Sequence, residues 1–253
     1  MKYFWLEKSL LPQEMGYELF SAEHIVSLLI ILVLNIILYS AFCKMDGKKQ
    51  NIFIKTCALI LPILEAFKIA VLVIQGTFDA QYFPLYLCSV GILIFPVAAF
   101  SKNKRIAEYA TEAGIIMIIP GSLMALLFPN WIGFYQPFSF LSIYSYLWHG
   151  LIIFIPVCMW KMVKVSIRFE SIIHSFIVLA ILLPIVIICD QVFRMNYWFL
   201  ERPDLNNPFL FIYQKYGYTM YITCIILLAF IMCTLSYSLF SFLQKRRTGR
   251  ENE

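Results

Sequence analysis

The sequence predicts an all-α, polytopic membrane protein with about seven transmembrane helices, forming a single domain over residues 1–253. Hydrophobic residues make up 61% of the chain and charged residues only 14%, whereas soluble domains carry about 25% charged residues. The apolar runs 25–42, 138–160 and 218–240 approach the roughly 20 residues that cross about 30 Å of hydrocarbon. Both observations exclude an ordinary soluble fold.

The apolar runs predict seven spans, at 24–43, 52–74, 82–100, 107–127, 138–160, 172–193 and 217–241. Residues 1–23 carry charges such as Glu7 and Glu18 and lack the apolar core of a signal peptide. Their aromatic and leucine side chains favour an interfacial segment on the outer face. Residues 242–253 form a basic tail, which we expect to be cytoplasmic.

Lysine and arginine positions predict the orientation of the bundle. Thirteen of them follow the first, third, fifth and seventh spans: Lys44, Lys48, Lys49, Lys102, Lys104, Arg105, Lys161, Lys164, Arg168, Lys245, Arg246, Arg247 and Arg250. Five lie on the other side: Lys2, Lys8, Arg194, Arg202 and Lys215. We therefore expect an outside N-terminus, a cytoplasmic C-terminus and a multi-pass protein of a cell membrane, a bacterial-type plasma membrane in particular. The basic belt favours anionic lipid headgroups as neighbours and gives no indication of nucleic-acid binding.

The outer connections differ from the inner ones because they are aromatic and nearly uncharged. Residues 76–84, 128–137 and 194–216 contain most of these aromatic side chains. Tyrosine and tryptophan prefer the headgroup level, so an aromatic belt explains the pattern. A set of loops that caps an outward-opening cavity explains it equally well.

Ionisable side chains inside the predicted spans are functional candidates, because each costs about 2.5–3.5 kcal/mol to insert. Glu65 and Lys68 lie at i and i+3 in the second span and can pair on one helix face. His149 lies within the fifth span, and Asp190 lies near the outer end of the sixth. At 1.5 Å of rise per residue, Glu65, Lys68, Cys88 and His149 all fall about 9–17 Å below the outer helix ends. A purely structural ion pair is the simpler alternative for Glu65 and Lys68.

Cys88 and His149 have the residue types of a nucleophile and its general base. Cys88 follows Pro84 near a predicted helix start, where the helix dipole increases thiolate character. Gly150, next to the histidine, permits close approach of another helix or a ligand. With seven cysteines and three histidines in the chain, a buried cysteine and a structural histidine remain the alternative.

Three short motifs in order resemble the YwaF-type family of integral membrane proteins. Residues 84–89 read Pro-Leu-Tyr-Leu-Cys-Ser, His149-Gly150 follows about sixty residues later, and residues 196–203 read Asn-Tyr-Trp-Phe-Leu-Glu-Arg-Pro. That family is similar to animal transmembrane protein 164, an acyltransferase of ether phospholipids. More distantly, the chain is similar to androgen-induced hydrolases of fatty-acid esters, which use a threonine nucleophile. Family members often carry histidine where this chain has Tyr86.

The resemblance implies a cysteine nucleophile at Cys88 and a catalytic histidine at His149. We expect an acyltransferase that passes a phospholipid acyl chain through a thioester to a lysophospholipid or, as a lipid ester hydrolase, to water. The expected substrate-binding residues are Glu65, Lys68, Tyr86, Asp190 and Asn196. No cofactor is expected, and no metal, because His24, His149 and His174 lack ligand spacing.

A transporter or solute-binding membrane protein is the main alternative, since it would use the same polar groups for recognition. A structural or regulatory membrane protein is a further alternative. A retinal-binding receptor is excluded because the span at 217–241 contains no lysine for a Schiff base.

Overall fold

The computed structural model describes residues 3–12, 15–163, 165–203, 207 and 209–251, and all regular structure among them is helical. Two of the charges counted for orientation, Lys2 and Lys164, lie outside this part of the chain. The first two long helices are α1 (Ala22–Lys44) and α2 (Gly47–Ile74). The three-residue turn η1 (Lys8–Leu10) precedes them. After α2 the chain continues through η2 (Ala80–Tyr82), η3 (Leu87–Val90), α3 (Gly91–Phe100), α4 (Lys104–Ala113), η4 (Gly114–Ile118), α5 (Ile119–Leu127), α6 (Phe140–Val163), α7 (Glu170–Phe193) and α8 (Leu210–Glu251).

Polar caps set the starts of several helices. The Ser21 side chain accepts a hydrogen bond from the backbone of His24 and begins α1. Asp46 accepts from the Lys49 N–H and begins α2 after a short turn. Asn103 does the same for α4. Each cap satisfies backbone donors that have no partner within the helix.

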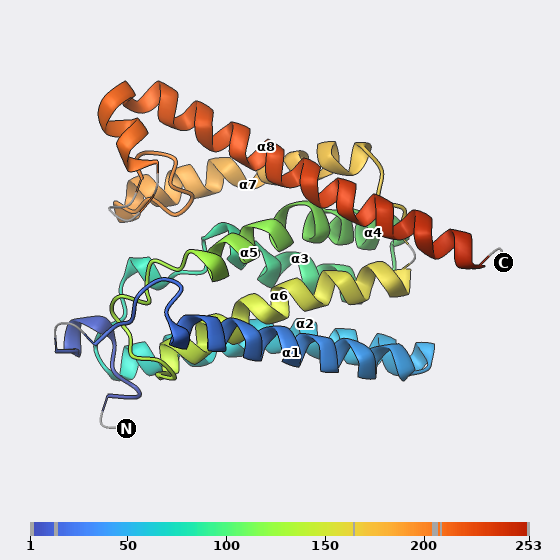
Figure 1. The fold of residues 1–253 in the computed structure, drawn as a ribbon, viewed down its shortest axis with the longest axis horizontal. Helices are drawn as coiled ribbons and strands as arrows, with labels where there is room; N and C mark the ends of the chain where they lie inside the picture. The colour runs from blue at the N-terminus through green and yellow to red at the C-terminus, as the bar shows by residue number, and fades with distance from the viewer. Residues whose placement is uncertain (1–2, 13–14, 164, 204–206, 208, 252–253) are drawn as a thin grey trace.

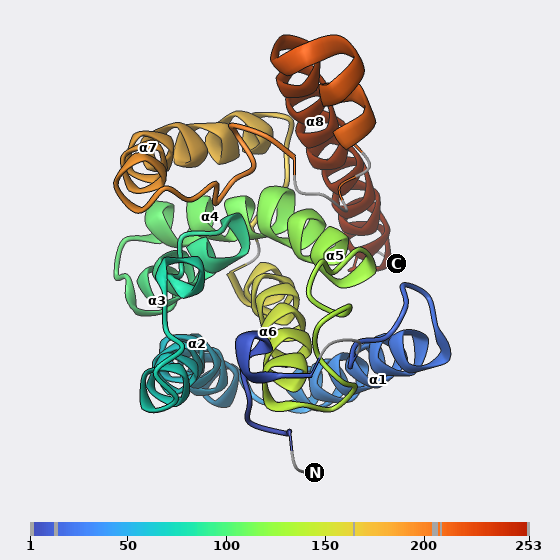
Figure 2. The ribbon, with the colours of Figure 1, turned by 90° about the vertical axis from the view of Figure 1, so that its left-hand side faces the viewer.

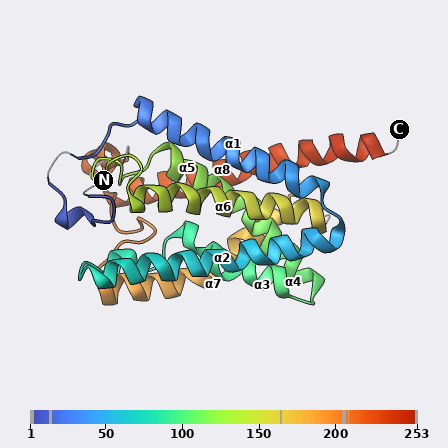
Figure 3. The same cartoon turned by 90° about the horizontal axis from the view of Figure 1, so that it is seen from below.

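The central helix of the bundle is α6. In the end-on view, α1, α2, α3 and α5 surround it, while α7 and α8 form an outer pair over α4 and α5 (Figure 2). The N- and C-termini lie at opposite ends of the bundle (Figure 1), and α8 extends beyond the other helices at its C-terminal end (Figure 3). The end that carries the N-terminal segment and the connections 75–86, 128–139 and 194–203 is called the loop end below. Its assignment to the outside stays a prediction.

Six helical stretches in the described residues are long and apolar enough to cross a membrane. They are Ala22–Lys44, Gly47–Ile74, Lys104–Leu127, Phe140–Val163, Glu170–Phe193 and Leu210–Arg247. Large apolar side chains cover the outer faces of α1, α7 and α8 and are exposed. A soluble protein does not expose so continuous an apolar surface, so these faces are suited to lipid. The protein is therefore a multi-pass membrane protein.

The third predicted span, 82–100, is wrong in its extent. The helix begins only at Leu87 with the 3₁₀ turn η3, and α3 then ends at Phe100. Together they extend about 23 Å, which is shorter than the roughly 30 Å hydrocarbon layer. Pro84 lacks an N–H group, and residues 77–86 form turns and irregular backbone. The fold therefore has six long helices and one short one, where seven full spans were predicted.

The fourth predicted span contains a wide turn. Residues 114–118 form a π-helical segment between α4 and α5, and all five are buried. The Ser236 hydroxyl of α8 donates a hydrogen bond to the Ile115 carbonyl, 2.7 Å away. That contact supplies a donor to a carbonyl in the interrupted helix and ties α8 to the bundle.

The N-terminal segment folds against the loop end. Glu7 is buried and accepts hydrogen bonds from the Tyr82 hydroxyl and from the Ser9 backbone at 2.7 Å. Burial alone would raise the pKa of Glu7, but these hydrogen bonds outweigh it and the pKa is lowered. Gln75, just past α2, bonds the backbone of Trp5 at 2.8 Å and of Glu7 at 3.1 Å. The segment is therefore fixed to α2 and η2 by polar contacts as well as by its apolar side chains.

Candidate functional site

A buried cluster of charged and aromatic groups joins α2 to α6. The Lys68 ammonium lies 2.6 Å from Glu65 Oε1, and both side chains are about a tenth exposed or less. The Tyr144 hydroxyl donates to the other carboxylate oxygen of Glu65. The Lys68 ammonium also lies 5.3 Å from the centre of the Tyr144 ring, which stacks on Trp148. Both oxygens of Glu65 therefore have partners, as a buried carboxylate requires.

Lys68 connects this cluster to the irregular segment before α3. Its ammonium donates a hydrogen bond to the Tyr82 carbonyl, 3.1 Å away. Cys88 lies within electrostatic reach of Glu65, Lys68 and Tyr144. The structure thus brings together three of the residues predicted from sequence, Glu65, Lys68 and Cys88.

Cys88 is half-buried in η3, at the start of the short third helix. Small residues allow this region to pack closely. A β-carbon at Gly121 of α5 would lie 3.6 Å from the Leu87 side chain, and one at Gly91 of α3 would lie 3.3 Å from Ile152 of α6. The Cys88 turn therefore packs against α5, and the start of α3 packs against α6.

The register of α3 against α6 relates Cys88 to His149. Both helices run away from the loop end, and Gly91 contacts Ile152. A β-carbon at Gly114 would touch both Phe95 of α3 and Pro156 of α6. Phe95 lies four residues after Gly91, and Pro156 lies four residues after Ile152. Cys88 and His149 each precede the Gly91–Ile152 contact by three residues. Both side chains therefore lie about one turn closer to the loop end than this contact.

Hydrogen bonding to the imidazole of His149 leaves one ring nitrogen as an acceptor. His149 Nδ1 lies 2.7 Å from the Ser145 carbonyl oxygen and 3.4 Å from the Ser145 hydroxyl. A carbonyl accepts only, so Nδ1 carries the proton and Nε2 of the neutral ring carries the lone pair. The side chain is buried. This arrangement suits a general base that acts through Nε2.

Three other predicted residues lie in or next to the segment 194–203. Asp190, in the last turn of α7, accepts a 2.8 Å hydrogen bond from the Tyr197 backbone. Asn196 donates to the Arg202 carbonyl at 2.6 Å and accepts from the Glu201 N–H at 3.0 Å. The Tyr86 ring, just before η3, contacts the Tyr197 ring edge-on at 5.3 Å. Asp190 and Asn196 thus bond the backbone of this loop.

Two features of the interior were missed from sequence. Tyr144 was absent from the candidates because a tyrosine near a span end is typical of an interfacial belt. Glu112 of α4 pairs with His174 of α7 at 2.7 Å, and Tyr109 packs 4.5 Å from the imidazole. Glu112 lies within the predicted span 107–127, so its position alone was a usable signal.

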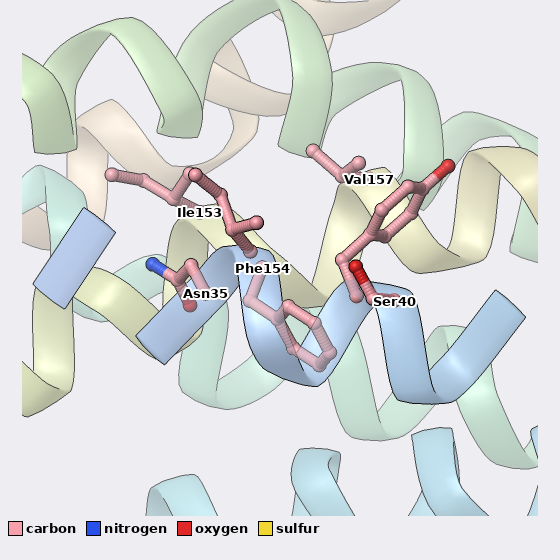
Figure 4. A pocket seen from close by; sticks show the side chains of 7 residues that line it. Asn35, Ser40, Ile153, Phe154 and Val157 are labelled. Carbon is pink, nitrogen blue, oxygen red and sulfur yellow. The ribbon is translucent and has the colours of Figure 1, made fainter. Parts of the chain in front are cut away.

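A shallow groove on the lipid-facing side of the bundle holds none of the predicted site residues. It measures about 210 Å³ and lies between α1 and α6. Asn35 and Ser40 of α1 face Ile153, Phe154 and Val157 of α6 across it (Figure 4). Its lining is almost wholly apolar, as expected for a crevice filled by lipid chains.

The described part of the chain contains no group of three or more His, Cys, Asp or Glu side chains placed to bind a metal ion. His24, for example, is occupied: the Phe20 N–H donates to its Nδ1 at 3.0 Å, and its Nε2 bonds the Leu126 carbonyl at 2.9 Å. Those contacts fix α1 to the end of α5.

Comparison with known proteins gives a family and no closer relative. No curated protein matches the chain, and no solved structure does. The model of the TMEM164 family matches residues 19–237, which include α1 to α7 in full, the Cys88 turn and the segment 194–203. Because this match covers most of the sequence, the chain belongs to the TMEM164 family, whose members are multi-pass membrane proteins.

Proposed function

We propose that this protein is a membrane-embedded phospholipid acyltransferase with Cys88 as nucleophile and His149 as general base. The observation that carries the proposal is the register of α3 against α6, in which both residues precede one shared contact by three residues. A thiol and an imidazole with a free Nε2 are the minimum that covalent acyl transfer requires. The reaction class is the one implied by the resemblance of the motifs at 84–89, 149–150 and 196–203, which lie within the residues matched by the TMEM164 family.

In the first half-reaction, His149 Nε2 takes the thiol proton and the Cys88 sulfur attacks an acyl ester carbonyl. The ester C–O bond breaks, the proton passes from His149 to the departing lysophospholipid oxygen, and a thioester remains on Cys88. In the second half-reaction, His149 removes a proton from the hydroxyl of an acceptor lysophospholipid, which attacks the thioester. The C–S bond breaks and the proton returns to the sulfur.

Lys68 supports this chemistry by its charge. Its ammonium lies within electrostatic reach of the Cys88 sulfur, in a buried region where charges interact strongly. We assign it to stabilising negative charge on the carbonyl oxygen of the substrate or to contacting the lipid phosphate, because its effect on the thiolate is opposed by the Glu65 carboxylate, which is also within reach. Glu65 and Tyr144 hold Lys68 in place through the contacts described above.

The test is intact-mass analysis of the purified protein with diacyl phospholipid, followed by neutral hydroxylamine. The proposal predicts an acyl adduct on Cys88 that hydroxylamine removes, its loss in Cys88→Ala and its strong reduction in His149→Gln. Cys224→Ser is the matched control, since this half-buried cysteine of α8 lies outside the site. Thermal unfolding in detergent checks that each variant is folded.

The second substrate decides between transfer and hydrolysis. Adding a lysophospholipid to the isolated thioester should produce diacyl lipid, whereas release of free fatty acid alone would make the protein an ester hydrolase. A folded wild-type protein that forms no adduct with any phospholipid refutes the acyl-enzyme. In that case, solute uptake into proteoliposomes would test the transporter alternative.

A further inference from the structure

The segment 194–203, called the strap below, lies over the stretch of chain that leads to Cys88. The Trp198 indole N–H donates to the Leu85 carbonyl at 2.9 Å, three residues before Cys88. The Tyr197 hydroxyl donates to the Ala80 carbonyl at 2.6 Å, and the Tyr197 side chain is almost wholly buried. Two side chains of the strap therefore satisfy two carbonyl groups of the irregular segment 77–86.

The strap is itself held in shape from several sides. The Asp190 side chain accepts from the Tyr197 backbone at 2.8 Å, and the Asn196 amide closes the loop onto residues 201 and 202. The Tyr221 hydroxyl of α8 donates to the Phe199 carbonyl at 2.5 Å. Phe199 has a left-handed backbone conformation, with φ of 56°. Residues other than glycine rarely adopt that conformation unless surrounding contacts hold them there.

The turn before Cys88 has little local structure of its own. Pro84 has no N–H group, and after the turn at residues 79–83, where the Phe83 N–H also bonds the Ala80 carbonyl, the described local backbone bonds are those of the Leu85 N–H to Phe83 and of the Ser89 N–H to Tyr86. The Leu85 carbonyl receives its hydrogen bond from outside this segment, from the Trp198 indole N–H. The position of the Cys88 turn therefore depends on contacts from the strap.

We propose that Tyr197 and Trp198 are positioning residues that hold the Cys88 turn in the orientation needed for attack. This inference rests on the proposed function for its catalytic meaning, but its structural content concerns only the mobility of Cys88. It gives the motif at 196–203 a role in placing the nucleophile. It also gives Asp190 and Asn196 a role in holding the strap, in place of the headgroup contact expected from sequence.

The test measures the alkylation rate of Cys88 by N-ethylmaleimide in the full-length protein in lipid nanodiscs, resolved by peptide mass spectrometry. Tyr197→Phe removes only the hydroxyl that bonds Ala80 and should raise the Cys88 rate about fivefold, the expected effect of losing one hydrogen bond. Tyr218→Phe, at an exposed tyrosine of α8, is the matched control and should leave the rate unchanged. Cys57, buried in α2, reports global unfolding.

A second pair of variants separates positioning from charge. Asp190→Asn keeps an oxygen that accepts from the Tyr197 N–H, so the Cys88 rate should stay within twofold of wild type. Asp190→Ala removes that acceptor and should raise the rate about as much as Trp198→Phe, which removes the donor to Leu85. If Asp190 acts by positioning the strap, the Cys88 alkylation rate should therefore rise in Asp190→Ala and stay near the wild-type value in Asp190→Asn.

Three results would overturn the inference: an unchanged Cys88 rate in Tyr197→Phe and Trp198→Phe, an equal rise at Cys57, or an Asp190→Asn variant as reactive as Asp190→Ala. Failure of the proposed function is distinguishable from these, because it shows as a wild-type protein without an acyl adduct. The alkylation rates test the strap whether or not the thioester forms. Where it forms, Tyr197→Phe should slow acylation at saturating lipid and leave the half-saturating concentration unchanged.

Discussion

Removing one partner of the Glu65–Lys68 pair should destabilise the protein far more than removing both. In Glu65→Leu, the Lys68 ammonium remains buried, and the Tyr82 carbonyl is its one remaining hydrogen-bond acceptor among the described residues. An unpaired buried charge costs about 3–5 kcal/mol in proteins where such a pair has been broken. The Tyr144 hydroxyl also loses its acceptor in this variant.

The double variant Glu65→Leu/Lys68→Met replaces the pair with apolar side chains of similar size. Replacing both members of a buried pair is often neutral or stabilising, but the Tyr144 hydroxyl still loses its acceptor, so the double variant should cost about 1–2 kcal/mol, less than either single variant. The two single variants would then show a coupling energy of several kcal/mol, since their effects are far from additive. Tyr144→Phe should cost less, about 1–2 kcal/mol, because only one hydrogen bond is lost.

The assay is unfolding by sodium dodecyl sulfate in mixed micelles, followed by tryptophan fluorescence, with acyl-adduct formation measured on the same samples. The double variant should be folded and should form the Cys88 adduct much more slowly, because the ammonium assigned to the carbonyl oxygen or phosphate of the substrate is gone. Additive single effects would refute the buried pair, and full activity in the double variant would refute a catalytic contribution from Lys68.

Other predictions concern the helix register, the N-terminal segment and the second buried pair. In Gly91→Ala the new β-carbon would lie 2.9 Å from a ring carbon of Phe95 in α3 and 3.3 Å from Ile152 of α6, so we expect a loss of about 1–3 kcal/mol in the same unfolding assay. Gly47→Ala, with nothing within 4 Å, should lose much less, and equal losses would contradict the register. The pKa of Glu7 is lowered, since its hydrogen bonds outweigh its burial, so its stabilisation is complete above the ordinary value of 4.5 and disappears as pH falls through the lowered value. Hydrogen exchange of residues 3–12, corrected for the intrinsic rate, should therefore accelerate below that pH, and Glu7→Gln should abolish this dependence. Glu112→Ala leaves His174 without its carboxylate and should cost about 1–3 kcal/mol, whereas Glu112→Gln retains an acceptor and should cost less. Equal effects of the two substitutions would argue against the hydrogen bond.

The long helices were predictable because hydrophobic length alone specifies them. The spans at 24–43, 52–74 and 172–193 agree with α1, α2 and α7 to within a few residues at most ends. Backbone groups in hydrocarbon need internal hydrogen bonds, so a long apolar run has few alternatives to a helix. The pairing of Glu65 with Lys68 followed from their i, i+3 spacing and is present.

The segment 75–86 was not predictable, because its structure depends on residues distant in sequence. Hydropathy extends the third span back to Tyr82, yet helix begins only at Leu87. The partners of Glu65 and of the Cys88 turn, such as Tyr144 and Trp198, come from α6 and the strap. A single sequence carries no signal of which tyrosine or tryptophan will contact which carbonyl.

The short third helix and the polar groups around it belong to one arrangement. Irregular backbone within a membrane protein persists only where its polar groups find partners in the protein. The carbonyls of Ala80, Tyr82 and Leu85 each accept a hydrogen bond from a distant side chain, two from the strap and one from Lys68. The same three contacts that compensate for the missing helix therefore fix the turn before the proposed nucleophile. It follows that the ion pair and the strap both hold the chain that leads to Cys88, and that weakening either should increase the mobility of its thiol without any change at Cys88 itself.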